Sequence, residues 1–335
     1  MRAQPVAAAP GGASWLDPIR EDLDTIEGLL TDAVASQVRQ VYSISEHVLL
    51  AGGKRLRPAL VALATRCLKP DASTEAMARV AASVELVHMA TLVHDDVVDS
   101  SAVRRGKATA NAVFGNGMAV IVGDYLLARS MHLLSEDFDR RILRAVSAVT
   151  IEMSEGEVME ILATGDTQLT EDAHLEIIRK KTAVFLEGCC RCGAILADAG
   201  EAEEDALAHY GSHMGIAFQL ADDLLDYLGD PAITGKPVGS DLREGRATLP
   251  FILALENAPP DIRERLLAAF GNPALTDADV TALVRLMERL QVFGRARTAA
   301  RMHADRAVDA VSLLPPSPYR ASLAELAEYC VSRER

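Results

Sequence analysis

Apolar residues recur along most of the chain with the three- to four-residue spacing of amphipathic or buried helices. Breaks between these segments carry residues that end or start helices, as where Gly52 and Gly53 precede Pro58. No segment shows a convincing strand alternation. The pattern therefore predicts an all-α chain, with helices over residues 15–50, 58–68, 74–100, 119–134, 140–162, 171–200, 203–228, 249–256, 260–268, 277–291, 294–314 and 319–332.

The composition fits a soluble helical protein of 335 residues, with 49% hydrophobic, 24% charged and only 4% aromatic residues. Residues 1–14 are rich in Ala, Pro and Gly and are predicted to be a disordered N-terminal tail. That segment lacks the apolar centre of a signal peptide, and no apolar run is expected to be a transmembrane helix. The net charge of −14 opposes nucleic-acid binding. Five cysteines form neither a disulfide framework nor a zinc spacing, which favours the reducing cytoplasm.

Two copies of an acidic pattern, Asp-Asp-x-x-Asp, stand in apolar helical segments. The first motif is Asp95, Asp96 and Asp99, and the second motif is Asp222, Asp223 and Asp226. Residues i and i+4 share one helix face, so each motif offers two carboxylates to a cation. Oxygen ligands favour Mg²⁺, which typically bridges carboxylates to a substrate phosphate. We therefore expect the two motifs to meet in a central metal-lined cavity of one domain, residues 15–335.

Basic residues at helix starts and turns are candidate partners of that phosphate. Lys54, Arg55 and Arg57 follow the glycine pair at 52–53, and Arg104 and Arg105 follow the first motif closely. The first cluster alone is equally explained as a solvated basic turn, whereas a pair of arginines beside the aspartate motif favours phosphate binding. Later candidates are weaker alone: Lys180-Lys181-Thr182, Phe218-Gln219, and Gly235-Lys236-Pro237 followed by Asp241 and Arg246. His88 lies one heptad before Asp95 and can donate to a phosphate, although an apolar helix more often holds a histidine as a core residue.

These motifs together resemble the trans-isoprenyl diphosphate synthases, the polyprenyl synthetase family. The resemblance spans roughly residues 50–255 and rests on ordered matches: Gly-Gly-Lys-Arg-Leu-Arg-Pro, His-Asp-Asp-Val-Val-Asp, Arg-Arg-Gly-Lys, Lys-Thr-Ala, Phe-Gln-Leu-Ala-Asp-Asp-Leu-Leu-Asp and Gly-Lys-Pro-Val-Gly-Ser-Asp-Leu. It implies a helical bundle of the isoprenoid synthase type that condenses isopentenyl diphosphate with an allylic diphosphate such as farnesyl diphosphate.

The resemblance also implies roles for individual residues. Mg²⁺ would be bound by Asp95, Asp99, Asp222 and Asp226. The allylic substrate would be contacted by Arg104, Lys181, Thr182, Gln219 and Lys236. Isopentenyl diphosphate would be held by Lys54, Arg57, His88 and Arg105. The expected catalytic set is both complete aspartate motifs together with Lys181 and Lys236. Arg246 stands where the family usually has Lys, so its contact is the least certain.

Product length is expected to depend on what blocks a tunnel beneath the first motif, near Thr91, Ala90 and Val87. No aromatic residue occurs in the eleven positions before Asp95, roughly 16 Å of helix. That absence favours a long product of about C40–C50, as in synthases that make quinone side chains, which residues 111–129 also resemble. Met131 is a candidate floor.

Several alternatives stay open from the sequence. A geranylgeranyl diphosphate synthase is the closest one, while a non-catalytic synthase subunit and a class I terpene cyclase are less favoured because both aspartate motifs and the isopentenyl site are complete. The resemblance implies a homodimer. Transient peripheral membrane contact is plausible for an enzyme with a long polyprenyl product.

Overall fold

The computed structural model of the chain describes residues 14–135, 139–229 and 238–332. The chain forms two compact units. The first unit comprises Met1–Thr150, Gly188–Ala208 and Val311–Leu323, and the second comprises Ile151–Glu187, His209–Ala310 and Ala324–Arg335. The all-α prediction is confirmed. The assignment of residues 15–335 to one domain stays a prediction, and the predicted tail lies outside the described residues except for Ser14.

The first unit begins with a 3-10 helix, η1 (Ser14–Ile19), followed by α1 (Arg20–Ala33) and α2 (Arg39–Leu50). The sequence pattern predicted one helix over this stretch, which was wrong. Helix α1 ends at Ala33, and the hydroxyl of Ser36 accepts a hydrogen bond from the backbone of Val38 at 3.1 Å. Such a local bond stabilises a turn and competes with continued helix.

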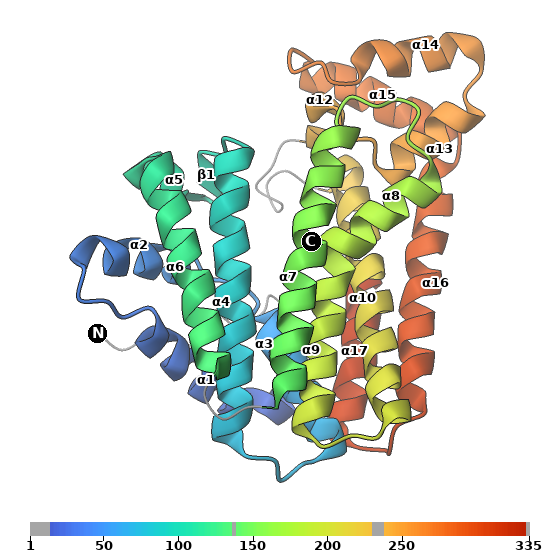
Figure 1. Cartoon of the computed structure of the whole chain (residues 1–335). Helices are drawn as coiled ribbons and strands as arrows, with labels where there is room; N and C mark the ends of the chain where they lie inside the picture. The colour runs from blue at the N-terminus through green and yellow to red at the C-terminus, as the bar shows by residue number, and fades with distance from the viewer. Residues whose placement is uncertain (1–13, 136–138, 230–237, 333–335) are drawn as a thin grey trace. The chain divides into compact units, whose positions relative to one another are not determined.

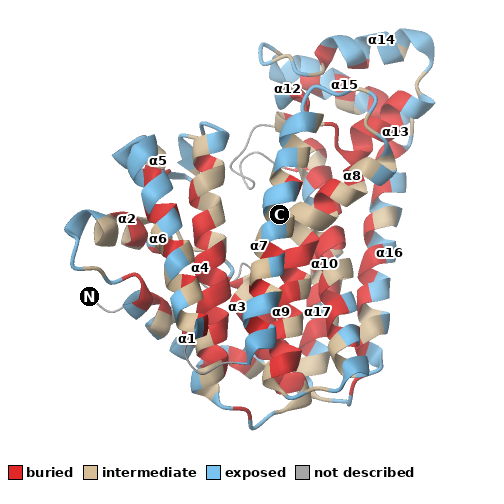
Figure 2. Ribbon diagram, viewed as in Figure 1, coloured by how far each residue is buried: buried red, intermediate tan, exposed pale blue. Residues whose placement is uncertain are grey.

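Helices α3 (Leu56–Leu68) and α4 (Thr74–Val98) form the centre of the first unit. Both are apolar on nearly all sides and are largely buried, as Figure 2 shows for α4. Helix α4 contacts α1, α3 and α6. By length and composition α4 could cross a membrane, contrary to the sequence expectation, but 72% of its most apolar stretch is buried inside the protein. This is the behaviour of a core helix.

Two short strands follow α4, β1 (Val103–Arg104) and β2 (Lys107–Ala108), which pair antiparallel. The expectation of no strands was therefore wrong at this point, because two-residue strands are too short to show an alternating pattern. The turn residues Arg105 and Gly106 both have positive φ, 53° and 73°. Two consecutive positive φ angles are typical of tight two-residue hairpins.

Helices α5 (Ala110–Phe114) and α6 (Asn116–Ser135) complete the N-terminal part of the first unit. Helix α6 lies beside α4 (Figure 1). The hydroxyl of Ser83 bonds to Ser130 at 2.8 Å, and Gly123 leaves room for the ring of His94, where a Cβ would lie only 2.2 Å from Nε2. The contact at Gly123 brings α6 close to the end of α4 that carries the first motif.

The next helices are α7 (Arg140–Ala163), α8 (Glu171–Ile178), α9 (Val184–Leu196) and α10 (Glu201–Leu228). One uninterrupted helix was predicted over residues 171–200. The structure instead places a π-helix, η2 (Arg179–Ala183), between α8 and α9. Single turns of π-helix are frequent at functional sites, and they leave no signature in apolar periodicity.

The second unit has its core around α13 (Leu249–Asn257), which packs with α8, α14 (Pro260–Ala269) and α15 (Asp277–Arg289). Phe251 and Phe270 stack with their centroids 4.5 Å apart. The remaining helices are α12 (Ser240–Glu244), which was not predicted, α16 (Val292–Ser312) and α17 (Pro318–Ser332). All five cysteines are buried and free.

Candidate active site

The first motif occupies the last turn of α4. Asp96 is only 5% exposed, whereas Asp95 is half-buried and Asp99 is exposed. The guanidinium of Arg104 donates to Asp96 Oδ1 at 2.7 Å. Burial raises the pKa of Asp96, and the Arg104 bond opposes that rise. Asp96 therefore points into the protein interior. Asp95 and Asp99, at positions i and i+4, remain as the candidate metal ligands.

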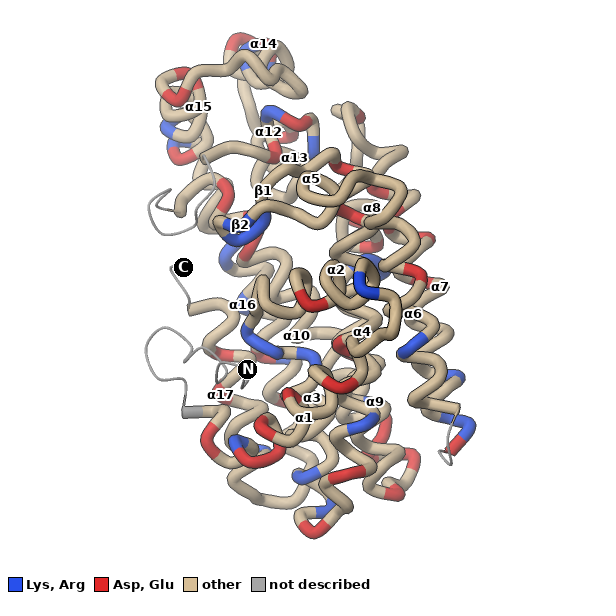
Figure 3. The backbone as a smooth tube through the Cα atoms, turned by 90° about the vertical axis from the view of Figure 1, so that its left-hand side faces the viewer, with Lys and Arg blue, Asp and Glu red and all other residues tan. Residues whose placement is uncertain are grey.

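The β1–β2 hairpin positions Arg104 and Arg105, whose backbone belongs to the basic segment seen in blue at these strands in Figure 3. Arg105 Nη1 donates to the carbonyl of Gly52. A Cβ on Gly53 would lie 2.8 Å from that same nitrogen. Glycine at this position therefore lets the hairpin turn approach the loop before α3, so that two basic segments distant in sequence come together.

Arg55 differs from the other cations of that loop because its side chain is buried in ion pairs. Its guanidinium donates to Glu27 and, at 2.8 Å, to Glu85, and its side chain is 8% exposed. Arg55 also has a left-handed backbone, with φ of 48°, immediately before α3. Its role is to fix the loop. Lys54 is exposed and Arg57 half-buried, and these two remain the candidate substrate cations of the loop.

His88 faces a strongly positive environment. Burial lowers the pKa of His88 well below its usual value, and the charges of Arg57, Arg105, Arg104 and Arg55 lower it further. Burial also lowers the pKa of Arg57 and that of Arg105. Several guanidiniums that share one partly buried region repel one another, so an anion bound among them would be stabilised. The predicted isopentenyl diphosphate residues Arg57, His88 and Arg105 are thus brought together.

A small cavity of about 40 Å³ lies in this region. Its lining includes His88, Asp96, Arg104 and Arg105, together with apolar side chains of α4 such as Met89 and Leu92. About 10–15 Å³ of such cavity volume holds one water molecule, so this cavity has room for only a few waters, and a diphosphate requires the basic side chains to move outward. The lining therefore combines positively charged and apolar side chains.

The second motif lies at the end of α10 in the second unit. Asp223 is 4% exposed, Asp222 is exposed and Asp226 is intermediate. Asp226 accepts hydrogen bonds from the backbone of Ser240 at 3.1 Å and Asp241 at 3.2 Å. These bonds fix the Asp226 carboxylate at the start of α12, yet each oxygen retains lone pairs for a cation.

Lys181 and Thr182 lie in the π-helix η2. Lys181 forms ion pairs with Glu157, at 2.9 Å, and with Glu160 of α7. Burial alone would lower the pKa of Lys181, but the two glutamates outweigh it and raise the pKa. Thr182 donates to Gln219 Oε1 at 3.2 Å. Among the predicted allylic contacts, Lys236 lies outside the described residues.

Asp241 was predicted from the sequence only as one of the residues that follow the candidate segment around Lys236. Burial raises its pKa well above the usual value, and the charges of Asp226 and Asp223 raise it further. Arg246 opposes this effect. A buried carboxylate among other carboxylates requires either a proton or a cation. The spacing of Asp241 from the second motif gave no signal of this proximity, because α12 was not predicted.

The donor chemistry of both motifs suits a hard divalent cation. Each motif supplies carboxylate oxygens only, and in the part of the chain that is described no three metal-ligating side chains converge on one point. Mg²⁺ commonly binds through one or two carboxylates and completes its shell with water and substrate phosphate. Two donors per motif fit that mode of binding and do not fit a closed structural metal site.

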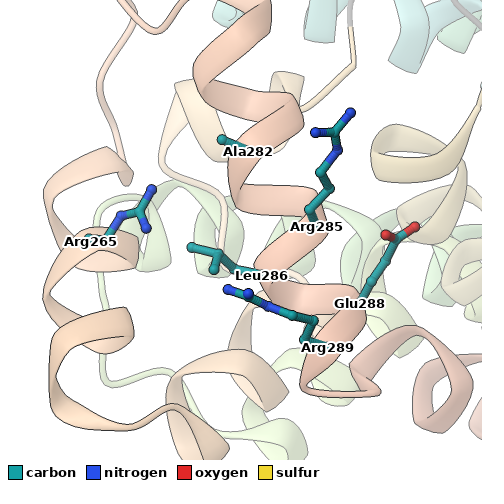
Figure 4. Close-up of a pocket in the computed structure, with 6 residues that line it drawn as sticks. All are labelled: Arg265, Ala282, Arg285, Leu286, Glu288 and Arg289. Carbon is teal, nitrogen blue, oxygen red and sulfur yellow. The ribbon is translucent and has the colours of Figure 1, made fainter.

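A larger hollow, of about 620 Å³, lies between α14 and α15 (Figure 4). Its lining includes the exposed Arg265, Arg285 and Arg289 around Leu286. None of the predicted catalytic, metal or substrate residues that the structure describes lines it. The small cavity beside α4 is therefore the better candidate for the reaction despite its size.

Comparison with known proteins agrees with the fold and the motifs. Residues 38–287 match the polyprenyl synthetase family. The octaprenyl diphosphate synthase of Escherichia coli is 36% identical over 320 residues, covering 94% of this chain and 97% of that enzyme. A short chain isoprenyl diphosphate synthase of Methanocaldococcus jannaschii is 39% identical over 253 residues, covering 74% of this chain and 76% of that protein.

Solved structures give the same result. The polyprenyl synthase of Caulobacter crescentus, complexed with calcium and isoprenyl diphosphate, superposes with a TM-score of 0.91 at 35% identity and covers 100% of both chains. Fold and sequence together define the class, an all-α prenyltransferase of the isoprenoid synthase type. The chain belongs to the polyprenyl synthetase family.

Proposed function

We propose that this chain condenses isopentenyl diphosphate with an allylic diphosphate, such as farnesyl diphosphate, in a Mg²⁺-dependent reaction that yields a long all-trans polyprenyl diphosphate. The observation that carries the proposal is the set of arginines around His88 beside the first aspartate motif. Positive side chains that surround a neutral donor suit a diphosphate, and the neighbouring carboxylates suit its cation.

The two substrates are assigned to different residues. Arg57, His88 and Arg105, with Lys54 at the entrance, hold isopentenyl diphosphate through charge and hydrogen bonds. Thr182, Gln219, Lys181 and Lys236 orient the allylic diphosphate, with Arg104 at the first motif. Lys181 is held by Glu157 and Glu160, which keep it protonated, so it presents a fixed positive charge.

Asp95, Asp99, Asp222 and Asp226 would hold Mg²⁺, with Asp96 and Asp223 fixed inside the protein. Mg²⁺, when bound, supplies Lewis-acid stabilisation of the departing diphosphate. The apolar side chains of α4 exclude water from the allylic carbocation, and His88 and the arginines place the double bond of isopentenyl diphosphate for attack. No side chain of the described site is positioned as an obvious base, so the released diphosphate takes the proton.

The helix below the first motif supports a long product. Thr91 lies on the face of α4 that carries Asp95, whereas Val87 is turned from it by about 80° and Ala90 by about 140°. Ala90 and Val87 are small buried side chains, and Thr91 is half-buried. A prenyl chain that grows along α4 meets no aromatic residue on this helix near Asp95. Products of about C40–C50, suited to quinone side chains, follow from an open tunnel, whereas a geranylgeranyl product requires a floor at this level.

Two further alternatives have less support. A non-catalytic subunit would not need both aspartate motifs, and a class I terpene cyclase would not need the basic residues Lys54, Arg57 and Arg105. Both sets are complete here.

We also propose that the enzyme is a cytoplasmic homodimer. Helices α5 and α6 leave several apolar side chains exposed, namely Val113, Phe114, Met118, Val120 and Ile121. Contiguous exposed apolar side chains favour burial against another copy. The acidic net charge and the free buried cysteines fit the cytoplasm, and transient membrane contact would deliver the product to a bilayer.

The test is steady-state kinetics with each substrate varied in turn. Arg57→Met is expected to raise the KM for isopentenyl diphosphate by about 10-fold or more, because it removes a charge-assisted contact. Thr182→Val should raise the KM for the allylic diphosphate instead. Chelation of Mg²⁺ should abolish the condensation. Equal effects of both variants on both substrates would contradict the assignment of two separate diphosphate sites.

A further inference from the structure

The middle aspartate of each motif is held inside the protein by a side chain from another element. Asp96 accepts from Arg104, which lies in β1. Asp223 makes the corresponding contact with His174 of α8, Nε2 to Oδ2, at 3.0 Å. The two motifs are thus anchored in the same way but by different chemistry, a guanidinium in one case and an imidazole in the other.

The contact of His174 is part of a continuous hydrogen-bonded chain. The second oxygen of Asp223 accepts from Gln219 Nε2 at 3.1 Å. Gln219 Oε1 in turn accepts from Thr182 of the π-helix. Both carboxylate oxygens of Asp223 are therefore engaged, and its two partners come from α8 and from α10 itself. Since a buried carboxylate without partners is costly, these bonds are what permits Asp223 to turn inward.

The inward orientation of Asp223 sets the orientation of its neighbours. Successive residues on a helix are separated by about 100°, so fixing Asp223 determines where Asp222 and Asp226 project. Asp222 is exposed, and Asp226 contacts the start of α12. A loss of the His174 contact would free the last turn of α10 to rotate, and the two outer carboxylates would lose their alignment.

We propose that His174 is a positioning residue for the second aspartate motif, acting through Asp223 to align Asp222 and Asp226 for the cation and the allylic diphosphate. The inference rests on the proposed function. The hydrogen bond from His174 to Asp223 needs only a proton on Nε2. A neutral side chain that donates from the same position is therefore sufficient to hold Asp223. His174 is 6% exposed, so it does not exchange protons with the solvent as a surface acid or base would.

The test compares His174→Gln with His174→Phe. Glutamine carries an amide nitrogen that reaches the position of Nε2, whereas phenylalanine keeps the ring but donates nothing. Mn²⁺ binding, followed by electron paramagnetic resonance in the presence of inorganic diphosphate, reports on the cation site without turnover. The expected dissociation constant rises about 10-fold or more in His174→Phe, the size of effect seen when residues that orient a metal site are removed. His174→Gln should restore most of the binding.

Kinetics give a second and independent readout. His174→Phe is expected to raise the KM for the allylic diphosphate and the Mg²⁺ requirement, with the KM for isopentenyl diphosphate unchanged, because the first unit is not altered. His209→Gln, at an exposed position of α10, is the control for loss of a histidine. If His174→Phe does not fold, His174→Asn replaces it, since its shorter amide does not reach Asp223.

The inference is overturned if His174→Phe binds Mn²⁺ as tightly as the unaltered protein. It is also overturned if His174→Gln and His174→Phe lose binding equally, because that result would assign His174 a packing role only. An unaltered protein that binds Mn²⁺ and diphosphate but does not elongate would instead contradict the proposed function. The metal-binding comparison would still decide the role of His174 in that case.

Discussion

At the scale of single residues, neighbours in sequence have opposite roles. Lys54 is exposed, but Arg55, next to it, is buried between Glu27 and Glu85. Asp95 is half-buried, but Asp96 is bonded to Arg104. From the sequence, the basic residues of the loop and the aspartates of the first motif were all predicted to take part in binding or catalysis. The residue pattern alone could not tell the binding residues from the structural ones, because that depends on which partner each side chain contacts in the fold. The role of Glu85 as the partner of Arg55 could not be predicted, because a single acidic residue in an apolar helix does not indicate which residue it pairs with.

Arg55→Met is predicted to destabilise the protein strongly. Glu85 is only 3% exposed, and removing Arg55 breaks its buried ion pair, at a cost of about 3–5 kcal/mol. Lys54→Met should change the free energy of unfolding by no more than about 0.5 kcal/mol, because Lys54 is exposed. Urea unfolding followed by circular dichroism measures both variants. Similar stabilities for the two would show that the Arg55 ion pairs are not formed.

Stability should fall in mild acid because of His303. Burial, together with the charges of the nearby His213 and Arg306, lowers the pKa of His303 to about 4. Between about pH 6.5 and 4 the unfolded chain then binds more protons than the folded one, so stability is lost as the pH falls through this window. The loss is about 1–3 kcal/mol. Denaturant midpoints at pH 7.5 and 5 should differ less in His303→Gln. An unchanged difference would exclude His303 as the cause.

At the scale of elements, apolar periodicity predicted most of the helices but not the short pieces between them. The π-helix η2, the β1–β2 hairpin and α12 carry or fix Lys181, Arg104 and Asp226, and all three were missed. The π-helix and α12 are five residues each, and the two strands of the hairpin are two residues each, too short for a periodic pattern to emerge. The aspartate motifs and His88 lie on helices that were predicted, whereas the residues that anchor or supplement them lie on the short elements that are hardest to predict from sequence.

Gly156→Ala tests the contact between α7 and the π-helix. A Cβ at this position would lie 2.7 Å from the backbone nitrogen of Lys181, which cannot move aside as a side chain could. We expect a loss of about 1–3 kcal/mol in stability and a raised KM for the allylic diphosphate. Gly28→Ala is the matched control, because nothing lies within 4 Å of its Cβ, and it should be neutral or slightly stabilising. Thermal unfolding of both variants provides the measurement. A Gly156→Ala protein as stable as Gly28→Ala would contradict this packing.

At the scale of the whole molecule, the family and the all-α fold could be predicted from the sequence because the motifs occur in a fixed order. A long product was also predicted from the sequence, but the exact number of isoprene units could not be, because it depends on the depth of an apolar path. Relatives with long and with short products share similar identity with this chain. Small side chains along α4 support the long product, and a single position on this helix provides a direct test.

Thr91→Phe is predicted to shorten the product. Thr91 is four residues before Asp95 on the same face of α4, and it is half-buried, so a larger side chain can be accommodated there. A phenyl ring at this level would block a growing chain soon after the first additions. Thr91→Ser should leave the product unchanged. Chromatography of the dephosphorylated products distinguishes these results, and an equally long product from Thr91→Phe would place the path elsewhere.

Mg²⁺-dependent elongation to a long product is tested by the product size of the unaltered protein. The protein is incubated with Mg²⁺, farnesyl diphosphate and labelled isopentenyl diphosphate, with Asp95→Ala as the blank. We expect chains of eight to ten isoprene units from the unaltered protein and none from Asp95→Ala. Products that stop at four units would contradict the open path along α4, and no elongation would contradict the proposed function.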